Sequence, residues 1–196
     1  MSAPVNRPGA RGLDAFLDAL EAPAPSPCGG TAAAASAAMA AALVTMVARG
    51  SSDWHDAAGI AAQAKVLRTR LTALGADDAA VFEKVLATAR DLSGTRAQRD
   101  FALGGALLKA AEVPLQIAEA GADVAELAAL AAAECKAQLR PDAAAAVALA
   151  EAAVCAAAHL VEINLATIPG NRNAEAAARL SAAAAAARAR VLGAPV

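Results

Sequence analysis

The amino-acid composition predicts an all-α protein, an antiparallel bundle of about six to eight helices. About one third of the 196 residues are Ala, the strongest helix former, because its side chain loses no entropy in a helix. Aromatic residues make up 2% of the chain and Tyr is absent, so residues typical of β-sheets are scarce. The length suits one domain with its own core. We assign residues 1–11 to a flexible N-terminal tail and residues 12–196 to a single helical domain.

Two helices are expected in the first quarter of the chain. The first is short and amphipathic, because apolar side chains recur at helical spacing in Leu13, Phe16, Leu17 and Leu20. An Ala/Pro/Ser linker over residues 22–28 leads to a second helix over about 31–49, which Gly50 ends. The apolar run 32–48 contains Ser and Thr, and Ala is nearly neutral for membrane insertion. We therefore expect a buried bundle helix rather than a membrane span.

The third helix is expected over about 54–92, after an N-terminal cap formed by residues 51–53. Its apolar stripe places Asp78 on the buried face, four residues after Leu74. A carboxylate within an apolar face costs several kcal/mol unless it is paired or hydrated. The alternative is that the segment 75–78 breaks the helix and that Asp78 caps the next one.

Proline positions organise the second half of the chain. Thr95 is expected to cap a helix that contains Pro114, which should kink the backbone and free the carbonyl of Ala110. A helix over about 122–138 follows. Pro141 then lies in the first turn of another long helix, because the first turn tolerates a missing N–H.

The last helix, over about 173–192, contains little besides Ala and Arg, and we expect it to cover the surface or to face a partner. A core built from Ala buries little area per residue, so the helices must approach closely. Flat apolar faces of this kind favour further burial in an oligomer.

Charge and cysteine usage exclude several classes of function. The formal net charge is −2 and no basic cluster is present, so we expect no nucleic-acid partner. The three cysteines have no metal-like spacing, and their odd number fits a reducing cytoplasm. The only histidines, His55 and His159, are isolated, which predicts no metal site. We predict neither a signal peptide nor a membrane partner.

A glycine pair precedes the second helix in the segment Cys28-Gly29-Gly30-Thr31. Glycines let a ligand approach the backbone, and the first N–H groups of a helix have no partner within the helix. The segment is therefore a candidate cradle for an anionic or carbonyl group of a ligand. The alternative is an ordinary turn before a helix.

Glu112 shares a helical stripe with Phe101, Gly105 and Leu108, so we expect it to face inward beside the backbone that Pro114 opens. The alternative is that Glu112 is buried as the ion-pair partner of a Lys or Arg on another helix and has no role in function.

Two polar residues mark the ends of the next long helix. Asp142 lies in its first turn, where a carboxylate can simply favour the helix dipole. Asn164 lies near its end, where it can serve as a C-terminal cap.

Several segments resemble the C-terminal family of formiminotransferase-cyclodeaminase, over about residues 13–168. The N-terminal pattern is FLDAL, a Pro-rich turn, a glycine run and an Ala-rich helix that ends in MVAR. The most specific segment is KAAEVPL at 109–115, and DAAVF at 78–82 and INL at 163–165 are also similar. The chain departs from the family pattern at Cys28, Gln138, Pro141 and Leu160.

The resemblance implies a helical dimer that acts on a tetrahydrofolate derivative without a bound cofactor. Its bacterial members include methenyltetrahydrofolate cyclohydrolases, which hydrolyse 5,10-methenyltetrahydrofolate to 10-formyltetrahydrofolate. A carboxylate in a cleft of low dielectric can stabilise the amidinium cation and accept a proton from the attacking water. We assign the catalytic roles to Asp78, Glu112 and Asp142. The predicted substrate-binding residues are Cys28, Gly29, Gly30, Thr31, Arg49, Lys109 and Asn164.

Two other functions stay open on the sequence alone. One is formiminotetrahydrofolate cyclodeaminase, in which a nitrogen of the substrate attacks the formimino carbon and ammonia leaves. The other is a helical homologue that has lost catalysis and serves in binding or assembly, which the four departures favour. Retention of Asp78, Lys109, Glu112 and Asn164 favours an enzyme.

Overall fold

The computed structural model describes residues 10–22, 28–166 and 170–193. These residues form seven α-helices, one short 3-10 helix and no β-strand. The predicted all-α fold is thereby confirmed.

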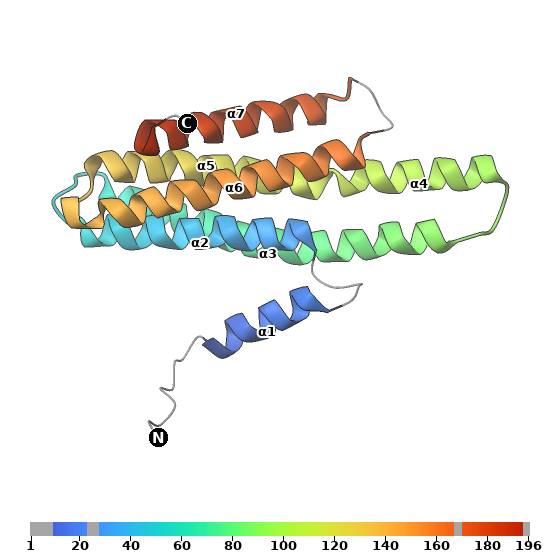
Figure 1. The fold of residues 1–196 in the computed structure, drawn as a ribbon, viewed down its shortest axis with the longest axis horizontal. Helices are drawn as coiled ribbons and strands as arrows, with labels where there is room; N and C mark the ends of the chain where they lie inside the picture. The colour runs from blue at the N-terminus through green and yellow to red at the C-terminus, as the bar shows by residue number, and fades with distance from the viewer. Residues whose placement is uncertain (1–9, 23–27, 167–169, 194–196) are drawn as a thin grey trace.

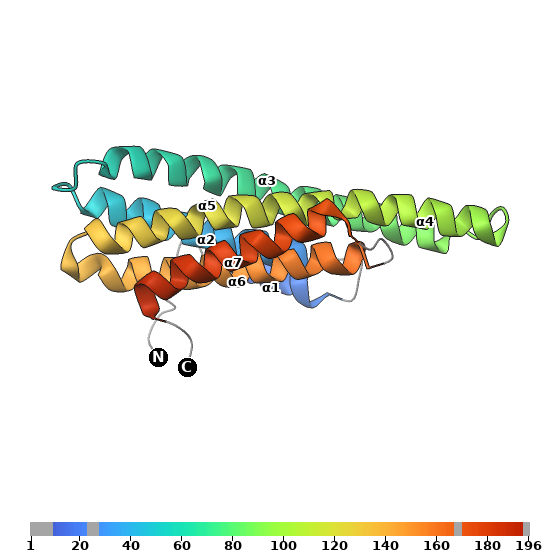
Figure 2. The ribbon, with the colours of Figure 1, turned by 90° about the horizontal axis from the view of Figure 1, so that it is seen from above.

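Four long helices form the centre of the bundle (Figures 1 and 2). The helix α2 (Gly29–Gly50) packs against α3 (Ala57–Arg90), α5 (Glu112–Glu134) and α6 (Arg140–Asn164). The helix α7 (Arg172–Leu192) packs on α5 and α6 and buries three of its alanines there. The last helix therefore covers the core, with bounds within one residue of the prediction.

In this core, the helices pack closely through small side chains rather than through large ones. A Cβ atom added to Gly121 of α5 would lie 2.8 Å from Cγ2 of Val154 on α6, which is closer than carbon atoms pack. The largest fully buried side chains are Leu71, Ile117 and several valines.

The second half of α3 and the helix α4 (Arg96–Ala110) form an arm that extends beyond the bundle (Figures 1 and 2). The chain turns between them at Gly94, whose φ of +75° favours glycine. Thr95 then caps α4 in a capping box, as predicted. Leu92 is 79% exposed and Phe101 is 86% exposed, so the described residues of one chain leave the apolar surface of the arm uncovered.

Pro114 divides one predicted helix into α4 and α5, which are separated at Ala111. The carbonyl of Ala110 accepts a hydrogen bond of 3.2 Å from Nδ2 of Asn164 on α6. The prediction that the proline frees this carbonyl is confirmed. The predicted bounds of the next helix, 122–138, are wrong, because α5 already begins at Glu112 and ends at Glu134.

The helix α3 continues without interruption through Gly75 and Asp78. The alternative that Asp78 caps a new helix is therefore wrong. The predicted cap of α3 by residues 51–53 is also wrong, since α3 begins at Ala57. The buried hydroxyl of Ser51 instead accepts a hydrogen bond of 3.2 Å from the backbone N–H of Lys136.

The first helix, α1 (Ala10–Glu21), confirms the predicted amphipathic helix and begins within the residues assigned to the tail. Residues 1–9 of that tail and 23–27 of the predicted linker lie outside the described residues. The division into a tail and one domain stays a prediction.

Three stretches are long and apolar enough, by length and composition alone, to cross a membrane: Gly29–Gly50, Arg96–Glu134 and Ala137–Asn164. The first of these is α2, and the third contains α6 after the 3-10 helix Ala137–Leu139. The helices α2 and α6 pack against each other, and each contributes nine buried residues. The run 32–48 thus lies in a helix that packs in the bundle.

Candidate functional site

Asp78 is the only buried charged side chain among the residues that the structure describes, with 7% of its surface exposed. It lies within α3 and faces the beginning of α2. Sγ of Cys28 donates a hydrogen bond of 3.1 Å to Oδ2 of Asp78. A Cβ atom on Gly30 would lie 2.3 Å from Oδ1, so the glycine leaves the space that the carboxylate occupies. Gly30 therefore accommodates the side chain of Asp78.

The start of α2 is held by α3. Cys28 precedes α2 as its N-cap residue, but its side chain does not cap the helix. The carboxylate of Asp78 lies at this end, where unpaired N–H groups favour negative charge. Oγ1 of Thr31 donates a hydrogen bond of 2.9 Å to the carbonyl of Gly75, one turn before Asp78. Residues of the predicted cradle 28–31 thus take part in the contact between α2 and α3, and their ligand-binding role stays a prediction.

Burial raises the pKa of Asp78 above its ordinary value of 3.8. The hydrogen bond from Cys28 and the backbone N–H of Thr31 lower this pKa by less than burial raises it. Burial, and next the neighbouring carboxylate, raise the pKa of the Cys28 thiol above 9.0. Cys28 is therefore the protonated donor of this pair at neutral pH, and the basicity of the Asp78 carboxylate is increased.

Asp78 lines an apolar cavity of about 210 Å³, to which α3, α4, α5, α6 and the start of α2 contribute. Its polar side chains are those of Cys28, Asp78 and Asn164. The remaining lining residues are Gly29, Val81, Phe82, Val85, Leu107, Ala110, Pro114, Leu160 and Ile163. One carboxylate in such an apolar wall can stabilise a cation or exchange a proton with a bound molecule.

A second cavity of about 450 Å³ adjoins the first along the arm and shares Val81 and Val85 with it. It lies between α3 and α4, and its lining includes the side chains of Lys84 and Lys109. The two cavities together can therefore receive an extended molecule with a reactive centre at one end and negative charge at the other.

The structure brings most of the predicted substrate-binding residues together. Cys28, Gly29 and Asn164 line the first cavity with Asp78. Gly30 and Thr31 lie directly behind that carboxylate, as described above. Lys109 lines the adjoining cavity. Sequence reasoning missed Lys84, because its proximity to Lys109 arises only when α3 and α4 pair as an arm.

Besides Gly30 and Thr31, three predicted site residues lie outside both cavities: Glu112, Asp142 and Arg49. Glu112 is exposed in the first turn of α5, so its predicted inward orientation is wrong in the single chain. The break at Ala111 is the reason, because it separates Glu112 from the stripe of α4. Asp142 and Arg49 lie at the other end of α6 and α2, roughly 30 Å away at a rise of 1.5 Å per residue. The catalytic roles of Glu112 and Asp142 stay predictions.

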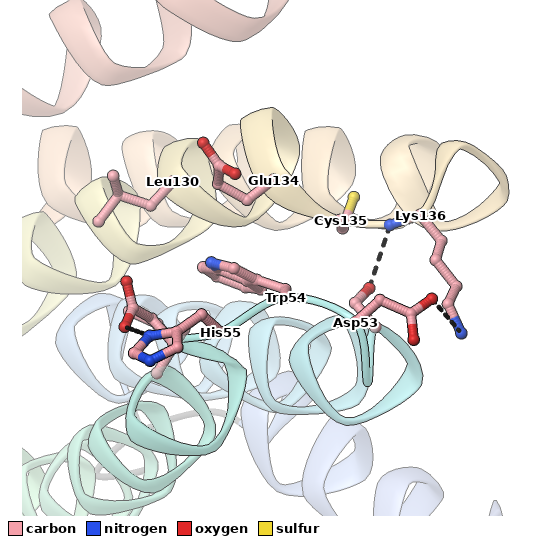
Figure 3. Close-up of a pocket in the computed structure, with 10 residues that line it drawn as sticks. Asp53, Trp54, His55, Leu130, Glu134, Cys135 and Lys136 are labelled. Atoms are coloured by element: carbon pink, nitrogen blue, oxygen red, sulfur yellow. Dashed lines mark hydrogen bonds and ion pairs between the residues drawn. The ribbon is translucent and has the colours of Figure 1, made fainter.

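Another cavity, of about 520 Å³, lies between the α2–α3 connection and the end of α5 (Figure 3). Trp54 and Leu130 border it. Four of the titratable side chains in its lining form two pairs: Nζ of Lys136 is 3.8 Å from Asp53, and Nδ1 of His55 is 2.8 Å from Asp56. Within the described residues, no group of three or more His, Cys, Asp or Glu side chains is placed to hold a metal ion. Asp78 has a buried carboxylate without a cationic partner among the described residues. The first cavity, which Asp78 lines, is therefore the candidate active site.

The raised pKa of Asp78 predicts a loss of stability with rising pH. Since the folded state binds this proton more tightly than the unfolded state, the free energy of unfolding should fall from about pH 3.8 up to the folded pKa. The variant Asp78→Asn should lack this part of the pH dependence, so its stability relative to the wild type should grow across that window. Urea unfolding of both proteins between pH 4 and 8 measures the difference, and parallel profiles would contradict the assignment.

Comparisons with known proteins identify the family of this chain. The family model for formiminotransferase-cyclodeaminase matches residues 12–190. The chain is 33% identical over 162 residues to methenyltetrahydrofolate cyclohydrolase of Methylorubrum extorquens, a match that covers 78% of each protein. The crystal structure of formiminotetrahydrofolate cyclodeaminase from Thermotoga maritima is similar with a TM-score of 0.80 and 26% identity, over 91% of this chain and 92% of that one. The protein belongs to the formiminotransferase-cyclodeaminase family.

Proposed function

We propose that this protein is an enzyme of tetrahydrofolate one-carbon metabolism that hydrolyses 5,10-methenyltetrahydrofolate to 10-formyltetrahydrofolate. The observation that carries the proposal is the buried carboxylate of Asp78, without a cationic partner among the described residues, in the wall of an apolar cavity. The cyclohydrolase of M. extorquens, which is similar over 78% of both chains, supports this reaction.

The reacting carbon of methenyltetrahydrofolate lies between N5 and N10 in a cationic amidinium group. Asp78 stabilises this cation and takes one proton from the attacking water, whose oxygen bonds to the carbon. The bond between this carbon and N5 then breaks, N5 takes the second proton and N10 keeps the formyl group. Asp78 then returns its proton to solvent. The reaction thus consumes one water, releases one proton and needs only one side chain for proton transfer. We propose no bound cofactor.

The two adjoining cavities suggest how a folate is placed. The first, at about 210 Å³, is smaller than the roughly 300–1,000 Å³ of most ligand pockets, so it receives the reacting group and the adjacent ring. The rest of the substrate extends into the cavity along the arm, where Lys84 and Lys109 attract the glutamate carboxylates.

Neutralising these lysines should weaken substrate binding without changing the chemical step. Lys84→Gln and Lys109→Gln should each raise KM by roughly threefold to tenfold at low salt and leave kcat within about twofold, because a distant charge binds ground state and transition state equally. Lys65→Gln, which lies in α3 like Lys84 but outside both cavities, is the matched control. Equal KM values for all three variants would contradict the proposed path of the tail.

A second candidate reaction is the cyclodeamination of formiminotetrahydrofolate. The observation that favours it is the similarity to the T. maritima cyclodeaminase over 91% of this chain. In that reaction the leaving ammonia needs a proton, and the raised pKa of Asp78 increases the fraction of its carboxyl group that can supply one.

Two assays on the purified protein distinguish the reactions. Accelerated loss of the methenyl chromophore, in a buffer where spontaneous hydrolysis is slow, would support the cyclohydrolase. Release of ammonia from formiminotetrahydrofolate, without effect on methenyltetrahydrofolate hydrolysis, would support the cyclodeaminase instead. If the protein turns over neither substrate, the results would instead support a homologue that has lost catalysis and serves in binding or assembly.

We further propose that the protein is a homodimer whose interface includes the arm of α3 and α4, because Leu92 and Phe101 are exposed and none of the described residues covers them. Light scattering after gel filtration should give twice the chain mass for the wild type, and Phe101→Asp should shift it toward one chain. A wild-type monomer at micromolar concentration would contradict this. The three free thiols support a reducing cytoplasmic location.

A further inference from the structure

We propose that Cys28 is a positioning residue for Asp78, whose thiol proton holds one carboxylate oxygen in place at the cavity wall. The catalytic consequence rests on the proposed function. The hydrogen bond itself is a property of the free protein and can be tested without substrate.

The geometry around Cys28 is set by the backbone. Its extended conformation, with φ of −111° and ψ of −168°, places it immediately before α2. Its carbonyl accepts the first hydrogen bond of the helix, 3.0 Å from the N–H of Ala32. The half-buried side chain does not turn back to cap α2. It points across to α3, where Sγ lies 3.1 Å from Oδ2 of Asp78.

The chemistry of the pair favours this direction of donation. An ionised carboxylate only accepts hydrogen bonds, and the thiol keeps its proton because burial and the neighbouring charge raise its pKa. The hydrogen bond in turn lowers the pKa of Asp78 and opposes the effect of burial. Cys28 thus keeps Asp78 ionised over a wider pH range.

No other side chain at the cavity performs this task. From α2, the N–H of Thr31 also lowers the pKa of Asp78. The cavity residues contributed by α4, α5 and α6 include no charged side chain, and Asn164 is their only polar one. Cys28 is therefore the one titratable neighbour of Asp78 in this lining.

The first test is a titration of the Asp78 carboxyl carbon by NMR, assigned by its absence in Asp78→Asn. Cys28→Ala should raise the pKa of Asp78 by about 0.5 or more, because the donor is lost. Cys28→Ser should stay near the wild-type value, since its hydroxyl can donate. Cys155→Ala removes an exposed thiol elsewhere and should change nothing. A wild-type or lower pKa in Cys28→Ala would overturn the proposal.

A second measurement does not depend on the folding of the Cys28 variants. In Asp78→Asn the thiol loses the neighbouring negative charge, so its pKa should fall and iodoacetamide should alkylate Cys28 faster at pH 8 than in the wild type. Mass spectrometry of the peptide that contains Cys28 measures the rate. An unchanged rate would also overturn the proposal.

The pH profile of kcat distinguishes a positioning role of Cys28 from a purely structural one. If the enzyme hydrolyses methenyltetrahydrofolate, Cys28→Ala should shift the pH profile of kcat upward with the pKa of Asp78, and Cys28→Ser should restore the wild-type profile. An unshifted kcat profile with an altered titration would overturn the catalytic part alone. An inactive wild type would refute the proposed function, while titration and alkylation would still decide whether the hydrogen bond holds Asp78.

Discussion

Replacing Asp78 by Asn should reduce the turnover of methenyltetrahydrofolate by about 100-fold or more, the usual contribution of a general base. The amide has nearly the same shape, and its oxygen can still accept the hydrogen bond from Cys28. It cannot take a proton from water, and it carries no charge to stabilise the amidinium cation. The variant should therefore bind substrate in the same cavity and fail at the chemical step.

The same variant should not unfold the protein. A buried carboxylate without a cationic partner is costly, and its replacement by a neutral group of equal size should leave the free energy of unfolding at neutral pH equal or higher. Initial rates and urea unfolding at pH 7 measure the two effects. Asp77→Asn changes the exposed neighbouring carboxylate and is the matched control. Turnover of Asp78→Asn within threefold of wild type would remove Asp78 from the mechanism.

Adding one methyl group at Gly30 should damage both stability and activity. The new Cβ would lie 2.3 Å from Oδ1 and 2.4 Å from Cγ of Asp78. The carboxylate is buried and hydrogen-bonded to Cys28, so it cannot move aside without losing that contact. Overpacking of this kind costs about 1–3 kcal/mol, and displacement of Asp78 should reduce turnover by roughly tenfold or more.

Gly59→Ala provides the contrast. A Cβ atom on Gly59 of α3 meets nothing within 4 Å, so this substitution should stabilise the protein by about 0.5–1 kcal/mol through helix propensity. Urea unfolding of the two variants measures the change in stability, which should be a loss for Gly30→Ala and a gain for Gly59→Ala. Initial rates measure the loss of turnover expected for Gly30→Ala. If Gly30→Ala is as stable and as active as the wild type, the Asp78 side chain does not occupy the position described.

Local patterns were sufficient for most of the fold. Ala content and helical spacing predict the helices, Thr95 starts α4, and Pro114 frees the carbonyl of Ala110 as expected. The stripe through Leu71 and Leu74 correctly places Asp78 inside. These features depend on residues within one or two turns of each other, and such short-range effects are expressed directly in the sequence.

The break at Ala111 shows where such reasoning ends. Extending the stripe of α4 across it assigned Glu112 to the interior, but a new helix begins there and its side chain is exposed. One interrupted turn changes the rotation of every following side chain about the helix axis. Spacing along the chain cannot supply that angle.

By itself, the sequence determined the all-α class, the approximate helices, the family resemblance and the burial of Asp78. Only the tertiary structure decided which residues meet it. The contact between Cys28 and Asp78 joins residues 50 positions apart, and Gly30 makes room for that carboxylate. Asp142 and Arg49 are separated from it because long, straight helices carry them to the other end of the bundle. Helix length and packing angle set these distances, and both result from the assembled core rather than from any single segment.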